Sequence, residues 1–253
     1  MVDLNRIGIG TGAAKNLTVG LLHAAYDMGM NVVDTAANYD TEAVVGQSVA
    51  DRRSSIFVAT KVGPESLSAR QLVVSCDDSL RRLNTSYINL LQVHWPNPAI
   101  PMQDTAKGFQ HLLKQGKIVN VGVCNVTPPQ LKKWVECIPE LYSVQNEYNI
   151  FDRTVEPKIL SYCFKENIKF FAYSPLDGGH FGGPKRKVDL AIVAKTHGID
   201  LAAMCLRYLL ETPGVHVLPR ITTEDRLRGV AGSEALLDGH CSDVMTAVFS
   251  TSV

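Results

Sequence analysis

Residues 31–94 contain the same pattern three times, in NVVDTAANYD (31–40), IFVATK (56–61) and INLLQVH (88–94). In each segment a short apolar run stops and a polar, titratable side chain follows: Asp34, Lys61 and His94. Tyr39 comes five residues after Asp34. Short apolar runs of this kind are typical of buried parallel strands, and the carboxyl ends of such strands lie at one edge of a sheet. The pattern therefore predicts a carboxylate, a phenol, an ammonium and an imidazole at one edge.

The same alternation of strand-like and helix-like segments continues along the chain. Eight short runs rich in β-branched residues are predicted as strands: Ile7–Gly10, Asn31–Asp34, Ile56–Thr60, Ile88–Val93, Val119–Val123, Tyr142–Gln145, Ile168–Ala172 and Val215–Leu218. Amphipathic helices are predicted between most of them: Leu17–Met28, Ser68–Leu83, Thr105–Gln115, a helix beginning at Pro128 and Pro129, Val155–Asn167, Lys187–His197, Leu201–Glu211 and Thr223–Val230. A last helical segment, Ser233–Phe249, has no strand after it.

Eight strand–helix units in 253 residues predict an α/β fold of the (β/α)8 TIM-barrel type, with residues 1–253 as a single domain. A doubly wound open sheet is the alternative, because residues 8–13 (GIGTGA) match G-x-G-x-x-A at the end of the first strand. Asp34 would then hold a ribose at the end of the second strand. That alternative assigns no role to Tyr39, Lys61 or His94, so the barrel is favoured.

The composition excludes several classes of function. Lys plus Arg and Asp plus Glu both number 25, so nothing favours nucleic acid or an anionic membrane as a partner. No apolar run approaches the ~20 residues of a membrane span, and the first ten residues lack the apolar region of a signal peptide. The histidines show no metal-binding spacing. Six scattered cysteines predict buried thiols and a reducing, cytoplasmic location: Cys76, Cys124, Cys137, Cys163, Cys205 and Cys241.

The four polar residues form a chemically coherent set. A tyrosine with its ordinary pKa of about 10 is a poor acid at neutral pH. The ammonium of Lys61 would lower the pKa of Tyr39, and Asp34 would keep that lysine charged and in place. His94 could donate a hydrogen bond to a substrate oxygen. Each residue alone would be unremarkable at the end of a strand, but together they indicate proton transfer.

The segments NVVDTAANYDTE, ATK, LQVHWP, GVCNV, SVQNEYN, FAYSPL and VLPRITTEDR resemble, in order, the active-site segments of the aldo-keto reductases. The resemblance covers nearly the whole chain. It implies a (β/α)8 barrel and an NAD(P)H-dependent carbonyl reductase. It also implies that Tyr39 is the general acid, that Lys61 and Asp34 tune it, and that His94 orients the substrate carbonyl.

The resemblance further implies a dinucleotide site on the later strand ends. Cys124, Asn125 and Gln145 would face the nicotinamide carboxamide, and Tyr173 would stack on the nicotinamide ring. Ser174, Leu176 and Gly178 would lie beside the pyrophosphate, and Arg220, Ile221, Thr222 and Arg226 would hold the adenosine end. Two guanidiniums suit a 2′-phosphate, which favours NADP(H) over NAD(H).

Some positions depart from the family's pattern. Cys124 replaces a serine, Gly229 and Val230 replace a Glu-Asn pair, and Gly12 stands where an aromatic residue is frequent. The chain also lacks the family's N-terminal hairpin and has short segments after residue 187 and after residue 230. These departures predict a wide, exposed substrate pocket with Trp95, Tyr148 and Phe151 as its apolar walls.

We therefore expect an oxidoreductase that reduces an aldehyde or ketone with NADPH, or oxidises the corresponding alcohol. Two alternatives stay open: an NAD-linked sugar or alcohol dehydrogenase on the same fold, and a cofactor-binding regulatory protein with little turnover. A bulky natural-product ketone is a further possible substrate. The expected partner is this small molecule, with no nucleic acid, membrane or metal. The oligomeric state is left open between monomer and dimer.

Overall fold

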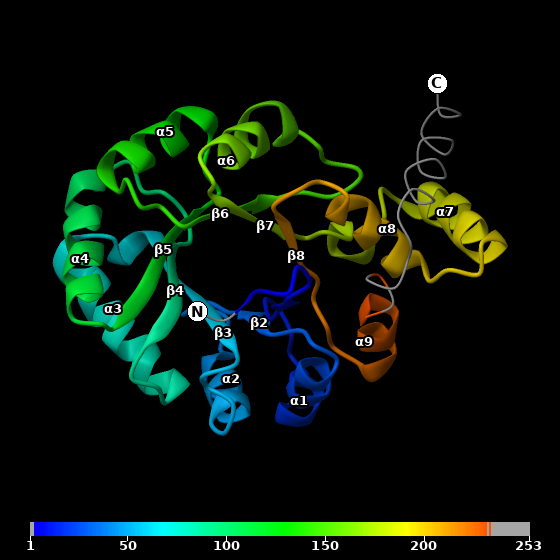
Figure 1. Ribbon diagram of the computed structural model, residues 1–253, viewed down its shortest axis with the longest axis horizontal. Helices are drawn as coiled ribbons and strands as arrows, with labels where there is room; N and C mark the ends of the chain where they lie inside the picture. The colour runs from blue at the N-terminus through cyan, green and yellow to red at the C-terminus, as the bar shows by residue number, and fades with distance from the viewer. Residues whose placement is uncertain (1–2, 232, 234–253) are drawn as a thin grey trace.

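A ring of helices surrounds eight parallel strands in the computed structural model, which describes residues 3–231 and 233 (Figure 1). The strands follow one another in chain order around the ring, so the predicted barrel is confirmed and the open sheet is wrong. Their bounds are β1 Ile9–Gly10, β2 Val32–Asp34, β3 Phe57–Val62, β4 Ile88–Val93, β5 Ile118–Cys124, β6 Ser143–Glu147, β7 Lys169–Tyr173 and β8 Val215–Leu218.

Backbone contacts between β8 and β1 close the ring. The Gly8 amide donates to the Val217 carbonyl at 2.9 Å and the Gly10 amide to the Pro219 carbonyl at 3.0 Å. A Cβ atom on Gly10 would lie only 2.8 Å from the Leu218 carbonyl oxygen. The glycines of the G-x-G-x-x-A match therefore allow two strands to approach closely, which explains the motif without an open-sheet nucleotide fold.

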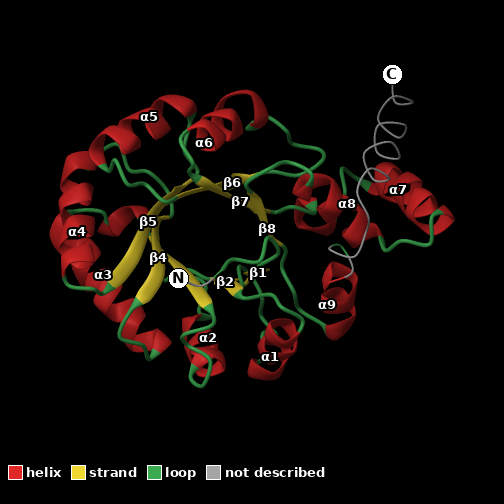
Figure 2. Cartoon of the chain, in the orientation of Figure 1, coloured by secondary structure: helices red, strands yellow, loops and turns green. Residues whose placement is uncertain are grey.

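The helices cover the outside of the strands (Figure 2). Their bounds are α1 Val19–Asp27, α2 Glu42–Val49, α3 Ala69–Leu83, α4 Met102–Lys114, α5 Pro128–Cys137, α6 Ser161–Lys165, α7 Pro184–Thr196, α8 Leu201–Leu210 and α9 Glu224–Ala231. A π-helical turn, Glu156–Leu160, precedes α6 inside the predicted helix Val155–Asn167. The predicted helix Ser233–Phe249 lies outside the described residues, except for Ser233. No helix of the described part is long and apolar enough to cross a membrane.

Helix α2 was not predicted from the sequence. Its eight residues include Gly46 and several β-branched side chains, which are weak helix formers. Tertiary contacts stabilise it instead: the buried Glu42 carboxylate accepts from Thr60 Oγ1 and from Arg82 Nε, both at 2.6 Å. A Cβ on Gly46 would lie 2.4 Å from the Leu83 carbonyl oxygen. This glycine therefore lets α2 pack directly on the end of α3.

Apolar side chains fill both the barrel and the layer between the sheet and the helices. The inner cluster comprises Val32, Phe57, Ala59, Leu90, Phe171 and Leu218, whereas neighbouring strand residues such as Val33 and Val58 belong to the outer core. No disulfide joins the described cysteines, and Cys137 is half-buried, so the prediction that it is buried is wrong. Cys241 lies outside the described residues.

Candidate active site

Strand periodicity brings the polar residues together above the inner apolar cluster. Side chains two residues apart in a strand point to the same face. Asp34 follows Val32 by two residues, Lys61 follows Ala59 by two, and Tyr173 follows Phe171 by two, so all three continue inward-facing rows. His94 follows Leu90 by four residues, which is also an even spacing, so these two side chains point to the same face as well. The carboxyl ends of the strands therefore present these side chains to one cavity.

The predicted acid–base residues form two directly bonded pairs. Lys61 Nζ lies 2.6 Å from Asp34 Oδ2, and it also donates to the Thr35 carbonyl oxygen at 2.9 Å. The Tyr39 hydroxyl lies 3.2 Å from His94 Nε2, and the two rings meet edge to face. Lys61 Nζ is 5.0 Å from the centroid of the Tyr39 ring, which joins the pairs into one cluster.

Burial and the Lys61–Asp34 pair set the charges of this cluster. Burial lowers the pKa of Lys61, but the Asp34 carboxylate and Tyr39 raise it, and the net shift is upward, so the ammonium stays charged. Burial and the Lys61 ammonium lower the pKa of His94 to about 4, so its ring is neutral at pH 7. Burial raises the pKa of Tyr39 above its ordinary value, while Lys61 opposes this effect. Lys61 therefore lowers the pKa of Tyr39, as predicted. The prediction that the pKa of Tyr39 lies below its ordinary value is wrong, because burial outweighs the effect of Lys61.

Buried histidines predict a loss of stability in acid. Burial lowers the pKa of His216, which lies outside the acid–base cluster, to about 4. The unfolded chain protonates at about pH 6.5, so the free energy of unfolding should decrease as pH falls from about 6.5 to about 4. We expect His216→Gln to weaken this dependence, as measured by urea unfolding across that window. Equal pH dependence in the variant and the parent protein would contradict this assignment.

A second set of polar side chains lies beside the acid–base cluster. Gln145 Nε2 donates to Asp34 Oδ1 at 2.9 Å, and Cys124 Sγ lies 3.8 Å from Gln145 Oε1. The Asn125 amide donates to the His94 carbonyl oxygen at 2.8 Å and accepts from the Tyr173 hydroxyl at 2.8 Å. Asn125 has φ 57°, a left-handed conformation that asparagine tolerates well. These contacts connect the strand ends of β5, β6 and β7 to the acid–base residues.

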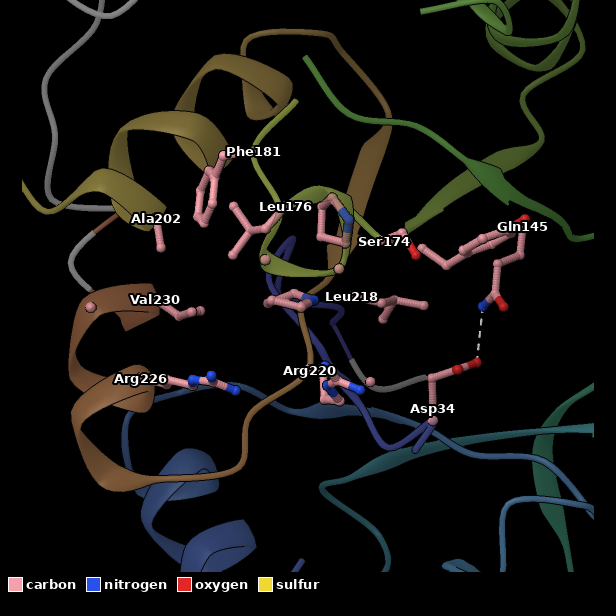
Figure 3. A pocket seen from close by; sticks show the side chains of 18 of the residues that line it. Asp34, Gln145, Ser174, Leu176, Phe181, Ala202, Leu218, Arg220, Arg226 and Val230 are labelled. Atoms are coloured by element: carbon pink, nitrogen blue, oxygen red, sulfur yellow. Dashed lines mark hydrogen bonds between the residues drawn. The ribbon is translucent and has the colours of Figure 1, made fainter. Parts of the chain in front are cut away.

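One cavity of about 670 Å³ runs from this cluster toward α8 and α9. Figure 3 shows Asp34 and Gln145 at one end and Ala202, Arg226 and Val230 at the other. Leu176, Ser174, Leu218 and Arg220 lie between these ends (Figure 3). The predicted residues that line the cavity are Asp34, Tyr39, His94, Trp95, Asn125, Gln145, Tyr173, Ser174, Leu176, Gly178, Arg220 and Arg226.

Other predicted residues support the cavity from behind. Lys61 and Cys124 are buried beneath it, and Ile221 belongs to the outer apolar core. Thr222 Oγ1 accepts a hydrogen bond from Arg226 at 2.9 Å, so it fixes a guanidinium that lines the cavity. None of these four side chains forms part of the cavity lining.

The expected apolar walls are only partly present. Trp95 lines the cavity and is 51% exposed. Tyr148 does not line it, because its side chain is buried outside the cavity, donates to Glu156 at 2.8 Å and packs edge to face on Phe170. Phe151 is also absent from the lining and instead packs against Gly182 of the loop after β7. The prediction that Tyr148 and Phe151 form walls of the pocket is therefore wrong.

Several lining residues were not predicted from the sequence. Lys187, Asp200 and Phe181 line the end of the cavity that faces α8 and α9. Asp200 is the N-cap of α8, and its carboxylate lies about 3 Å from where a Cβ on Gly229 would stand. Lys187 Nζ donates to the Gly179 carbonyl oxygen at 3.2 Å. An N-cap signal marks Asp200 in the sequence, but no local pattern indicates that these residues face a cavity.

Comparisons with known proteins identify a family and a shared fold. The model of a family described as the aldo/keto reductase family matches residues 5–238. Aldo-keto reductase YhdN of Bacillus subtilis is 28% identical over 85% of this chain and 80% of its own length. Methylglyoxal reductase YeaE of Escherichia coli is 28% identical over 88% of this chain and 82% of its own length.

Solved structures share the whole barrel. The thermostable aldo-keto reductase Tm1743, in complex with the inhibitor epalrestat, is 31% identical with a TM-score of 0.89, over 98% of this chain and 95% of that one. An aldo/keto reductase of Klebsiella pneumoniae, in complex with NADP and acetate, is 25% identical with a TM-score of 0.91, over 98% of this chain and 91% of that one.

Proposed function

The chain belongs to the aldo/keto reductase family, and from this premise we propose that it reduces an aldehyde or ketone with NADPH, using Tyr39 as the general acid. One observation carries the proposal: the Tyr39 hydroxyl, 3.2 Å from a neutral His94 ring and beside the Lys61–Asp34 ion pair, faces a long cavity. An acid, a hydrogen-bond donor and a buried positive charge in one place suit the protonation of a developing alkoxide.

The cavity fits a dinucleotide. Its volume of about 670 Å³ lies within the range of small-molecule and cofactor sites. Asn125, Gln145 and Tyr173 would hold the nicotinamide, and Ser174, Leu176 and Gly178 would lie beside the pyrophosphate. The guanidiniums of Arg220 and Arg226 would hold a 2′-phosphate. NADPH supplies the hydride when it is bound, and a Klebsiella pneumoniae relative has been solved in complex with NADPH.

The protein's own residues would transfer the proton to the substrate oxygen. The neutral His94 can donate from Nε2 to the substrate oxygen, which orients the carbonyl and withdraws electron density from its carbon. The Tyr39 hydroxyl then gives its proton to that oxygen. The charged Lys61 ammonium stabilises the resulting phenolate, and Asp34 holds Lys61 in place at 2.6 Å. In alcohol oxidation the same groups would act in reverse.

The proposal names a class of substrates, aldehydes and ketones, and not a single compound. Several relatives are named methylglyoxal reductases, so a small dicarbonyl is a reasonable first substrate. Gly12 lies next to Tyr39, and a Cβ there would be 3.3 Å from the tyrosine ring, so glycine leaves room beside the acid. A panel should therefore extend from methylglyoxal to bulky aryl ketones.

NADPH consumption with this panel tests the function. We expect turnover of at least one aldehyde with NADPH, and formation of the corresponding alcohol. Tight NADPH binding without turnover of any carbonyl would favour the regulatory alternative. Binding of neither NADPH nor NADH would overturn the proposal.

Arg226 tests the choice between NADPH and the NAD-linked alternative, which Gly229 and Val230 keep open. Arg226→Gln keeps a donor for Thr222 but removes the charge, so we expect the Kd for NADPH to rise about tenfold or more. The Kd for NADH should change little, because NADH has no 2′-phosphate. Fluorescence titration measures both constants.

Arg228→Gln is the matched control, since Arg228 lies on the same helix, pairs with Glu224 and Asp225, and does not line the cavity. This control should leave both constants unchanged. Equal weakening of NADPH and NADH by Arg226→Gln would indicate that Arg226 does not contact a 2′-phosphate.

A further inference from the structure

Both oxygens of the Asp34 carboxylate are bonded to side chains from distant parts of the barrel. Oδ2 accepts from Lys61 of β3 at 2.6 Å. Oδ1 accepts from Gln145 of β6 at 2.9 Å, as Figure 3 shows. All three residues are at most 5% exposed. Water therefore has little access to replace either bond, and the position of the carboxylate depends on both donors.

The orientation of the Gln145 amide follows from this contact. A carboxylate can only accept hydrogen bonds, so the amide must present its nitrogen to Asp34. The amide oxygen then lies 3.8 Å from the Cys124 thiol, which can donate to it. A flipped amide would place two oxygens about 2.9 Å apart. Asp34 thus holds Gln145 in a single orientation, and Gln145 holds Asp34.

We propose that Gln145 is a positioning residue of the acid–base set, acting on Tyr39 through Asp34 in addition to any contact with a cofactor. The proposal rests on the proposed function of Tyr39. Asp34 raises the pKa of both Lys61 and Tyr39, so a displaced or unbonded carboxylate changes the charges around the phenol. Removal of the Gln145 donor would leave Oδ1 as a buried acceptor without a partner.

The substitution Gln145→Glu separates this role from cofactor binding. A protonated carboxyl can donate to Asp34 as the amide does, whereas an ionised one repels it. The neighbouring carboxylate raises the pKa of the introduced group above the ~4.3 of an unfolded glutamate. We expect kcat within a few-fold of the parent enzyme at low pH, and then a loss of about tenfold or more through a new ionisation as pH rises.

Stability provides a readout without cofactor or substrate. Because the folded pKa of the introduced carboxyl is raised, its proton is retained in the folded protein and lost as pH rises. The urea midpoint of Gln145→Glu should therefore fall relative to that of the parent protein as pH rises from about 4.3, the pKa of an unfolded glutamate, to the folded pKa at which kcat falls. Gln145→Leu, which has no donor, should lower kcat about tenfold without the new ionisation.

Gln92→Leu is the matched control, because Gln92 is a buried glutamine of strand β4 whose side-chain oxygen accepts from Ser143 and not from the acid–base set. It should keep the parent pH profile. The proposal is overturned if Gln145→Glu changes only the KM for NADPH and keeps the parent profiles of kcat and stability. Failure of the parent protein to reduce carbonyls would instead refute the proposed function, while the stability profile would still test the bond to Asp34.

Discussion

Tyr39→Phe is expected to lower kcat for carbonyl reduction by about 100- to 10 000-fold, because it removes the only proton that the phenol can transfer. The ring and its edge-to-face contact with His94 would remain. The substitution therefore tests the chemistry with little change of shape. Steady-state kinetics with NADPH and the best aldehyde of the panel would measure the loss.

Binding should survive this substitution. The hydroxyl is 3.2 Å from His94, and the residues proposed to hold the cofactor lie on later strand ends. We expect the Kd for NADPH in Tyr39→Phe to stay within about threefold of the parent value, since no charged contact is lost. Tyr148→Phe is a matched control, because Tyr148 is a buried tyrosine that donates to Glu156 outside the cavity. Retained turnover in Tyr39→Phe would refute the mechanism.

Lys61→Met is expected to destabilise the fold by about 3–5 kcal/mol, because it leaves the buried Asp34 carboxylate without its cation. Lys61 is 1% exposed and Asp34 is 5% exposed, so water has little access to replace the lost contact. Catalysis should fall as well, since the phenolate of Tyr39 would lose its stabilising charge. Urea unfolding at neutral pH would measure the free energy of unfolding.

The double variant Asp34→Asn with Lys61→Met should recover much of that stability. The asparagine is uncharged and its oxygen can still accept from Gln145. Activity should not recover, because the ammonium is still missing. Lys117→Met offers a control: the Lys117–Asp77 pair is as short, 2.6 Å, but both side chains are partly exposed, so its loss should cost less than about 1 kcal/mol. Equal losses in the two lysine variants would show that burial does not set the strength of the Lys61 pair.

The proximity of Asp34 and Lys61 was predictable because strand periodicity is local. An apolar residue and the polar residue two positions later point to the same side of a strand. Once parallel strands are recognised, Asp34 and Lys61 must therefore lie near each other. The bond from Gln145 to Asp34 was not predictable in this way, since it joins residues 111 positions apart and depends on how far the barrel turns between β2 and β6.

Helix α2 and the two misplaced aromatic residues show the limits of local patterns. The sequence of α2 has poor helix propensity, and Glu42 stabilises it through contacts with two other elements. Tyr148 lies one residue beyond the end of β6, where strand periodicity no longer fixes direction, and its hydroxyl finds Glu156. Phe151 follows the same loop and packs on Gly182.

The sequence by itself determined the barrel and the convergence of Asp34, Tyr39, Lys61 and His94 at one edge, because alternation along a strand and the spacing of strand–helix units are short-range properties. Only the tertiary structure decided which loop residues meet at the far end of the cavity, such as Asp200, Lys187 and Gly229. It also decided the net pKa of Tyr39, because burial by surrounding side chains outweighs the charge of Lys61. Burial depends on every element that packs around a group, so a short stretch of sequence does not determine it.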